Sequence, residues 1–476
     1  MHLPSRLARM AIARSLLRSA RPSHGPSHGP SHGAKGGLLA LAVFLSSAVP
    51  QSPLSGIAFA EPPAIEQRAA AAAAPSREYL LFTGFPFPLG PFTERRTVET
   101  ELVKDRVYSF EQEIRLSGIS ANIRSTVFRM RDNHLLVYNP VAPTQEFLQQ
   151  LEALHSDGVS HILLGATPYE HKVFVPSFSR HFPAAKVWAV PDQWSFPVDL
   201  PSPLLGIDTK GSGGGDLVDT AGGSAAYAGA PDLTSEFEVK LLHPRRRLGL
   251  GYAANEAALL HKDTKTLALT DALVNVPSAP TRVYDEANLL AIGDNAERSS
   301  SLGSLILRAA GAVNWQGTGS KDIGQLWTSD APGRQGSEAE QLQRGWERNV
   351  VLSLFFGPSP ATIVDPKPSF QALEGRWVVA PVTDSLIYAS DRVQPELARW
   401  VDDLARWDFR MIAPSHFDAR EGTPEDLRAA FAPTLAKSRG GAATDPATPV
   451  TARPYNVDDV RLLDGIATEL VKLKVI

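Results

Sequence analysis

The sequence has 476 residues, 43% of them hydrophobic and 21% charged, which is ordinary for a globular protein and excludes a wholly disordered chain. The formal net charge of −4 argues against a nucleic-acid partner bound through a broadly basic surface. Because the chain has no cysteine, disulfides, thiolate nucleophiles and cysteine-ligated metal sites are excluded, and His, Asp and Glu remain as the strong metal ligands.

The first 60 residues have the features of a bipartite targeting segment. They contain no acidic residue and six basic ones, which leaves a formal charge of about −10 for the rest of the chain. An acid-free start rich in Arg and Ser is typical of a transit peptide, and an apolar run at 38–49 is followed by the A-x-A cleavage signal of residues 58–60. This order resembles the targeting segments of thylakoid-lumen proteins. It implies a chloroplast location, in the lumen or alternatively in the stroma. The apolar run is too short for a membrane span, and none is expected in the mature chain.

Residues 61–76 are expected to form a linker, and residues 77–436 a single folded domain. Residues 437–476 are expected to form a further linker and a C-terminal amphipathic helix that packs on the core. Glycine-rich or polar stretches at 211–229, 317–337 and 438–454 are predicted to be irregular or exposed loops. The run GSGGG at 211–215 lacks the strand and helix context of a phosphate-binding loop, and is interpreted as a flexible linker.

Strand and helix signals alternate within the domain. In chain order, the predicted elements are strands 124–130 and 135–138, helix 145–155, strand 161–164, helix 172–180, strand 186–190, strands 257–261 and 266–270, a helix from Pro395, strand 411–413 and a helix opened by Thr423-Pro424. The turn Asp132-Asn133 predicts a hairpin, and Thr144 can cap the helix that follows it. The alternation favours an α/β layered fold, while the hairpins argue against a purely parallel sheet.

Three polar residues stand just past predicted strands, where sites in α/β sheets usually form: His171, Asp271 and His416. Metallo-β-lactamase-like hydrolases place their ligands in the same order, with an H-x-H-x-D-H loop, a lone His, an Asp that ends a strand and a final His. Residues 166–171 resemble that loop, but Ala166 and Pro168 replace its first two histidines.

The resemblance to these hydrolases implies that only part of their ligand set remains. Glu170 replaces the aspartate of the loop, and no histidine stands near Gly251-Tyr252, where the lone His is expected. The remaining candidate ligands are Glu170, His171, Asp271 and His416. Two histidines with two carboxylates form a suitable ligand set for one Zn²⁺, Mn²⁺ or Fe²⁺ ion.

Several longer segments resemble an uncharacterised family of chloroplast and cyanobacterial proteins with a metallo-β-lactamase-like fold. They are RMRDNHLLVYNPVAPT at 129–144, EHKVFV at 170–175, QWSFP at 193–197, HKDTKTLALTD at 261–271, GWER at 345–348 and IAPSHF at 412–417. The resemblance covers roughly residues 77–433. It implies an αββα sandwich with long loop insertions, and it implies no particular reaction.

Two functions remain open. The first is a degenerate single-metal hydrolase that activates water against a small ester, thioester or phosphoester, with its catalytic residues unassigned. The second is a non-catalytic member of the fold that binds a small molecule or another plastid protein. The first predicts a pocket in which all four candidate ligands lie within reach of one metal. The second predicts that the histidines pair with the carboxylates in a buried polar network, and that an apolar patch lies elsewhere.

Overall fold

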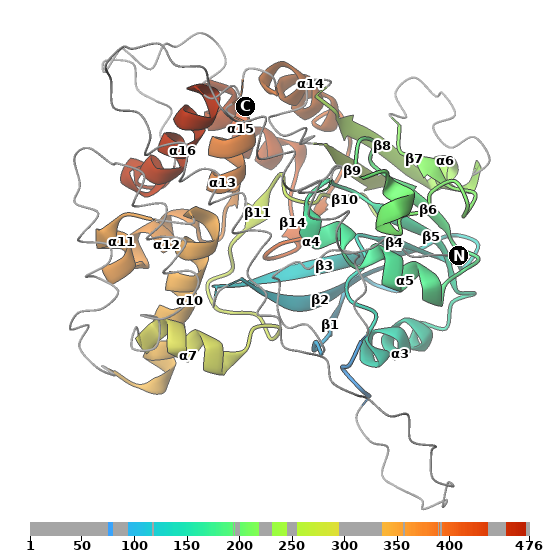
Figure 1. Cartoon of the computed structure of the whole chain (residues 1–476), viewed down its shortest axis with the longest axis horizontal. Helices are drawn as coiled ribbons and strands as arrows, with labels where there is room; N and C mark the ends of the chain where they lie inside the picture. Colours follow the sequence, from blue (N-terminus) through green and yellow to red (C-terminus); the bar gives the residue numbers. More distant parts are fainter. Residues whose placement is uncertain are drawn as a thin grey trace, which may run out of the picture.

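The computed structural model describes residues 75–79, 94–116, 119–193, 195, 200–218, 231–244, 255–294, 336–355, 358–388, 390, 393–436 and 454–472. Its elements form two sheets that face each other, with helices on their outer sides (Figure 1). The targeting segment, most of the linker before the domain and most of the low-complexity stretches at 317–337 and 438–454 lie outside the described residues, so what the sequence indicates about them stays a prediction. No helix among the described residues combines the length and the apolar composition needed to cross a membrane.

The first sheet follows the chain order from edge to edge. Its strands are β1 (Val98–Val103), β2 (Val107–Leu116), β3 (Ile119–Arg129), β4 (Leu135–Tyr138), β5 (Val159–Leu164), β6 (Lys186–Ala189) and β7 (Gly215–Asp216). Strands β1 to β4 pair antiparallel, and β4 to β7 pair parallel. The carboxyl ends of β4, β5 and β6 therefore lie at the same end of the sheet.

The second sheet has the order β14-β13-β10-β9-β8. Its strands are β8 (Phe237–Leu242), β9 (Glu256–His261), β10 (Thr266–Ala268), β13 (Met411–Ala413) and β14 (Arg420–Glu421), and a small separate sheet joins β11 (Val274–Asn275) to β12 (Trp377–Val378). Strands β10 and β13 pair parallel, whereas their other neighbours pair antiparallel. The segments that follow β10 and β13 therefore leave the sheet side by side.

The helices follow or interrupt the strands along the chain. They are α3 (Gln145–Ala153), α4 (Tyr169–Lys172), α5 (Val175–His181), η1 (Ser202–Leu205), α6 (Pro231–Glu236), α7 (Glu286–Asp294), α10 (Glu338–Phe355), α11 (Pro360–Val364), α12 (Lys367–Leu373), α13 (Pro381–Thr383), η5 (Asp384–Tyr388), α14 (Gln394–Leu404), α15 (Pro424–Ala436), η6 (Val457–Val460) and α16 (Arg461–Lys472).

The buried side chains define four layers. Between the sheets, Phe128 of β3 packs edge-on against Phe237 of β8. On the outer face of the first sheet, Phe147 of α3 packs against Phe110 of β2. On the outer face of the second sheet, the core cluster includes residues of α14 and α15, among them Trp400. Because apolar burial is the main driving force for joining such layers, the αββα sandwich predicted from the sequence is confirmed by its core.

The helix predicted at 172–180 is two short helices, α4 and α5. Pro176 lacks an N–H group, so it cannot continue the hydrogen-bond ladder of α4, and the chain starts a new helix at Val175. Two other local predictions are confirmed. Thr144 accepts a hydrogen bond from the Phe147 amide as the N-cap of α3, and Asn133 takes the left-handed conformation (φ 66°) in the turn between β3 and β4.

The interpretation of residues 211–215 as a flexible linker is wrong. Gly215 and Asp216 form the edge strand β7, which pairs parallel with β6. A Cβ atom on Gly214 would lie 1.9 Å from the carbonyl oxygen of Val187, so the glycine allows the two backbones to approach closely. Residues 219–230 of the same low-complexity stretch lie outside the described residues.

Candidate metal centre

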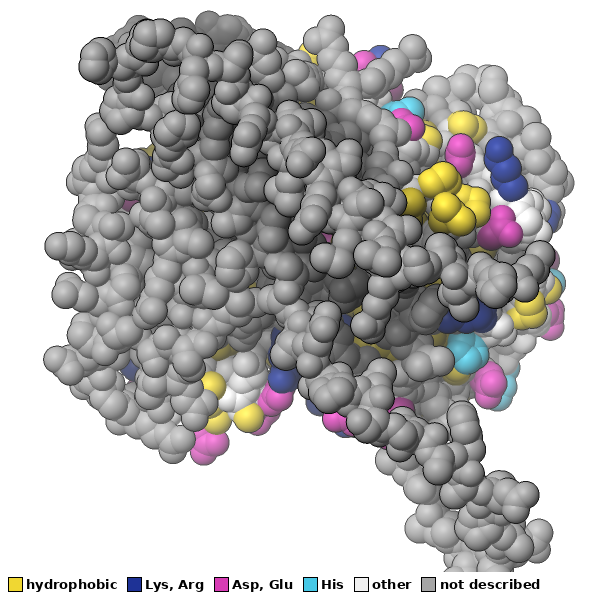
Figure 2. Space-filling model, viewed as in Figure 1, with side chains coloured by type: hydrophobic (Ala, Val, Ile, Leu, Met, Phe, Trp, Pro, Cys, Tyr) yellow, Lys and Arg dark blue, Asp and Glu magenta, His cyan; other side chains and the backbone are white. Residues whose placement is uncertain are grey.

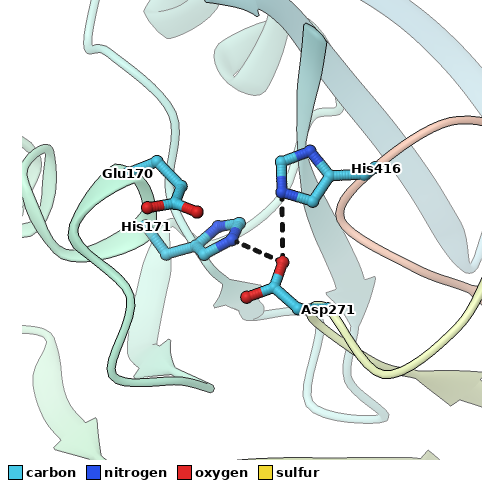
Figure 3. A group of neighbouring side chains, drawn as sticks. All are labelled: Glu170, His171, Asp271 and His416. Atoms are coloured by element: carbon cyan, nitrogen blue, oxygen red, sulfur yellow. Dashed lines mark hydrogen bonds and ion pairs between the residues drawn. The ribbon is translucent and has the colours of Figure 1, made fainter. Parts of the chain in front are cut away.

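The four residues singled out from the sequence meet at the carboxyl ends of the strands. His171 and Glu170 lie on α4, which follows β5, while Asp271 follows β10 and His416 follows β13. One candidate ligand atom from each residue lies within 4.8 Å of every other (Figure 3). The parallel register of β10 and β13 explains why Asp271 and His416 are adjacent although they are far apart in the sequence.

One oxygen of Asp271 is shared by both imidazoles. Its Oδ1 atom lies 3.2 Å from Nε2 of His171 and 3.1 Å from Nε2 of His416. The two rings lie 5.2 Å apart between centroids, at an interplanar angle of 62°. The carboxylate of Glu170 lies beside His171, and Figure 3 draws no hydrogen bond or ion pair from it to the other three residues, although its charge contributes to raising the pKa of His416.

The hydrogen bond on the far side of His416 decides which of its nitrogens carries a proton. Nδ1 lies 2.6 Å from the carbonyl oxygen of Asn122, and a carbonyl can only accept, so Nδ1 donates. In the neutral ring, Nε2 is then unprotonated, and its lone pair faces the Asp271 oxygen. This arrangement is favourable only with a cation between the two atoms, which is either a proton on Nε2 or a metal ion.

The pKa shifts agree with this electrostatic arrangement. Burial lowers the pKa of His416, but its hydrogen bond to Asp271 and the charge of that carboxylate outweigh burial and raise the pKa. Burial also raises the pKa of Asp271, yet the charge and hydrogen bond of His171, together with those of His416, hold it well below its usual range. Asp271 is therefore ionised at neutral pH.

The first sheet holds the loop of His416 in place. Asn122 of β3 donates from Nδ2 to the carbonyl of Phe417 (3.0 Å), and its Oδ1 accepts from the Phe417 amide (2.6 Å). Arg124, two residues further along β3, donates to the carbonyls of Pro414 and Phe417 and pairs with Glu111. Because Arg124 is only 2% exposed, these partners accept the hydrogen bonds that its guanidinium group would otherwise donate to water.

A buried carboxylate that the sequence analysis missed holds the loop of Asp271. Glu256, the first residue of β9, accepts backbone N–H bonds from Thr270 (2.7 Å), Asp271 (3.2 Å) and Ala272 (3.3 Å). Burial and the charge of Asp271 raise the pKa of Glu256, and the three N–H bonds oppose that rise. An acidic residue that starts a buried strand was the available sequence signal.

His261, whose orientation the sequence left open, lies in a separate group of ionisable side chains. Candidate ligand atoms of His261, Glu236 and Asp263 also lie within 4.8 Å of one another. Asp263 accepts hydrogen bonds from both Arg106 and Arg131, and Glu236 lies 3.7 Å from Arg106. A cation here would have to displace two guanidinium groups, so this group is better explained as an ion-pair network.

The His261 group predicts a loss of stability in acid. Burial and the charge of Arg106 lower the pKa of His261 from its usual value of 6.5 to about 4. Between these values the unfolded chain binds a proton that the folded chain does not, so stability falls as the pH drops below about 6.5. The full effect is about 3 kcal/mol near pH 4. Urea denaturation between pH 7 and pH 4 should show a shallower decline for His261→Gln than for the unchanged protein. Equal slopes would contradict the assignment.

One family model and several solved structures are similar to this chain. The family model for a domain of unknown function, DUF4336, matches residues 104–368 and 364–432. No curated protein sequence matches the chain. The metal-soaked Flv1 flavodiiron core from Synechocystis sp. PCC6803 is 11% identical, with a TM-score of 0.36 over 72% of this chain and 61% of that one. The metallo-β-lactamase from Pontibacter korlensis is 13% identical, with a TM-score of 0.27 over 41% of this chain and 83% of that one.

A flavoprotein from Thermotoga maritima is 8% identical, with a TM-score of 0.35 over 71% of this chain and 61% of that one. The chain thus spans 61% of the length of the flavodiiron core and of this flavoprotein. The fold assignment rests on the order of the four layers.

On the face drawn in Figure 2, acidic and basic side chains are interspersed over the described residues.

Proposed function

The chain belongs to the DUF4336 family, whose function is unknown, and we propose that it is a hydrolase with one divalent metal ion held by Glu170, His171, Asp271 and His416. The proposed substrates are small esters, thioesters or phosphoesters. The observation that supports the proposal best is the Asp271 oxygen shared by two imidazole Nε2 atoms, one of them on a ring whose other nitrogen is committed to Asn122.

The four side chains fit a divalent cation chemically. Zinc binds imidazole nitrogen and carboxylate oxygen at about 2.0–2.2 Å, which separates two ligands of one tetrahedral ion by about 3.4 Å. The Nε2–Oδ1 separations of 3.1 and 3.2 Å at Asp271 are close to that value. The bond from His416 to Asn122 is the kind of outer hydrogen bond that fixes the tautomer and orientation of a metal-binding histidine.

The protein groups would divide the work between binding and proton transfer. A divalent cation at this position supplies Lewis acidity that lowers the pKa of a water molecule. Asp271 contributes a negative charge, because its pKa is held low, and the Nε2 atoms of His171 and His416 contribute lone pairs. Glu170 is partly exposed and not hydrogen-bonded to Asp271, so it is the carboxylate that would leave the ion to open a position for water and accept a proton from that water.

A second candidate function is supported by the same contacts. Asp271 pairs with both histidines, as it would in a buried polar network that needs no metal. In that case the protein would be a non-catalytic binding or assembly protein with this fold. The two candidates differ in whether a proton or a metal ion lies between His416 and Asp271.

Elemental mass spectrometry of the purified protein tests the proposal. We expect about one equivalent of Zn, Mn or Fe per chain, together with hydrolysis of some ester, thioester or phosphoester that a chelator stops. Bound metal without hydrolysis of any substrate would support the metal site and contradict the proposed reaction. A folded, metal-free protein that added metal does not change would contradict the proposal and favour the second candidate.

A further inference from the structure

Asn139 lies where three loops of the candidate site converge. It directly follows β4, whose neighbours in the sheet are β3 and β5, and it is 2% exposed. Its backbone is left-handed (φ 51°), a conformation that Asn adopts more readily than most residues. This conformation turns the chain sharply at the strand end, at the edge of the sheet that holds the candidate ligands.

The side-chain amide of Asn139 makes one hydrogen bond to each of the three loops. Its Oδ1 atom accepts from the Gly165 amide (2.7 Å), at the start of the loop that leads to Glu170 and His171. Its Nδ2 atom donates to Oγ1 of Thr270 (3.0 Å) and to Oγ of Ser415 (3.0 Å). Thr270 immediately precedes Asp271 and Ser415 immediately precedes His416, so each bond acts close to a candidate ligand.

The direction of these bonds is fixed by the groups around them. The Gly165 amide can only donate, so the Asn139 oxygen must face it and the Asn139 NH₂ group must face the two hydroxyls. Tyr138 donates to the carbonyl of Ala257 (2.7 Å), so the Thr270 hydroxyl donates to Tyr138 (2.8 Å) and can only accept from Asn139. These bonds therefore form a directed chain.

The hydroxyl of Ser415 is committed in the same way. It points its proton toward the carbonyl of Leu269 (3.5 Å), which leaves its oxygen to accept from Asn139. A side chain of the same shape without the NH₂ group cannot replace these two donated bonds unless both hydroxyls give up their present acceptors. Residue 139 therefore has to be a double donor and a single acceptor.

The loop at Gly165 depends on this close approach as well. A Cβ atom on Gly165 would lie 2.1 Å from Oη of Tyr138, so the loop passes directly over the tyrosine ring. The absence of a side chain at this position brings the Gly165 amide within reach of Asn139. The three loops are thus joined at one buried amide, away from the candidate ligands themselves.

We infer that Asn139 is a positioning residue that sets His171, Asp271 and His416 relative to one another. For its metal-binding readout the inference rests on the proposed function. Asn139→Asp keeps the size of the side chain and its tolerance of the left-handed backbone, and removes the donors. The matched control is Asn133→Asp, at a second left-handed asparagine (φ 66°) whose Oδ1 accepts from Arg129 in the turn at the other end of β4.

The first readout is the metal dissociation constant, measured for Zn²⁺ by competition with a chelator. We expect Asn139→Asp to weaken binding about 10- to 100-fold, as the loss of outer hydrogen bonds at metal sites does, and Asn133→Asp to leave it unchanged. Ser415→Ala removes one of the three bonds and should cause a smaller loss in the same direction. It keeps the inference testable if Asn139→Asp does not fold.

The second readout needs no metal. Long-range ¹H–¹⁵N spectra of the metal-free protein report the ring nitrogens of His171 and His416, and these signals should shift in Asn139→Asp and stay in place in Asn133→Asp. If the unchanged protein binds no metal, the proposed function fails, while the ring signals still test Asn139. Lower stability of Asn139→Asp with unchanged ring signals and unchanged affinity would overturn the inference.

Discussion

Replacement of both His171 and His416 by alanine is expected to reduce bound metal from about one equivalent to background. The double variant removes both nitrogen ligands and leaves Asp271 and Glu170, which bind Zn²⁺ weakly without the imidazoles. The largely buried Asp271 also loses both groups that hold its pKa low. Elemental mass spectrometry after gel filtration measures the change, and near-UV circular dichroism checks that the variant is folded.

The control removes His134 and His181, which belong to neither group of candidate ligands among the described residues, by the same substitutions. The repeated histidines of residues 22–33 remain in both variants, so metal bound there contributes equally to both. We expect the control to keep its metal. Equal metal content in the two double variants would show that the ion is held somewhere other than at Asp271.

Arg124→Met is expected to lower the free energy of unfolding by about 3–5 kcal/mol, which is the usual cost of breaking a buried ion pair by removing one partner. Methionine fills part of the space of the side chain but leaves Glu111 without its cation. It also leaves the carbonyls of Pro414 and Phe417 without their Arg124 donor. Urea denaturation followed by tryptophan fluorescence measures the loss.

The double variant Arg124→Met, Glu111→Leu separates the unpaired charge from the other effects. Since both members of the pair are then apolar, we expect it to recover a large part of the stability lost in the single variant. A loss below about 1 kcal/mol in Arg124→Met would place the pair among exposed ion pairs of little energetic value, and would contradict its role in the fold.

Signals carried by neighbouring residues made much of the fold predictable. The turn Asp132-Asn133 marks the β3–β4 hairpin, and Thr144 marks the start of α3. Both signals can be read from the sequence because each residue determines the backbone conformation only a few positions away. The positions of His171, Asp271 and His416 after strands, together with the ligand order of metallo-β-lactamase-like hydrolases, were enough to predict that they meet. Asp271 and His416 follow parallel neighbours of the second sheet, whereas His171 follows β5 of the first sheet and joins them because the two sheets face each other.

The supports of the site could not be predicted in this way. Asn122 contacts His416 although the two are 294 positions apart, and Arg124 contacts Phe417 at a separation of 293. No local pattern in the sequence links residues so far apart. Asn139 lies in the segment 129–144, which resembles the family but does not single this residue out, and its three partners depend on how both sheets dock. Its polar side chain after a buried strand signals a site, but the identity of its partners is a property of the tertiary structure.

The parallel pairing of β10 with β13 has a consequence for the order in which the protein can be built. The strands of the first sheet pair in chain order, so they can assemble as they leave the ribosome. His416 can contact Asp271 only after the long segment between β10 and β13 has been synthesised and packed. Nascent or truncated chains would thus lack a complete ligand set, and metal uptake would be confined to the finished protein.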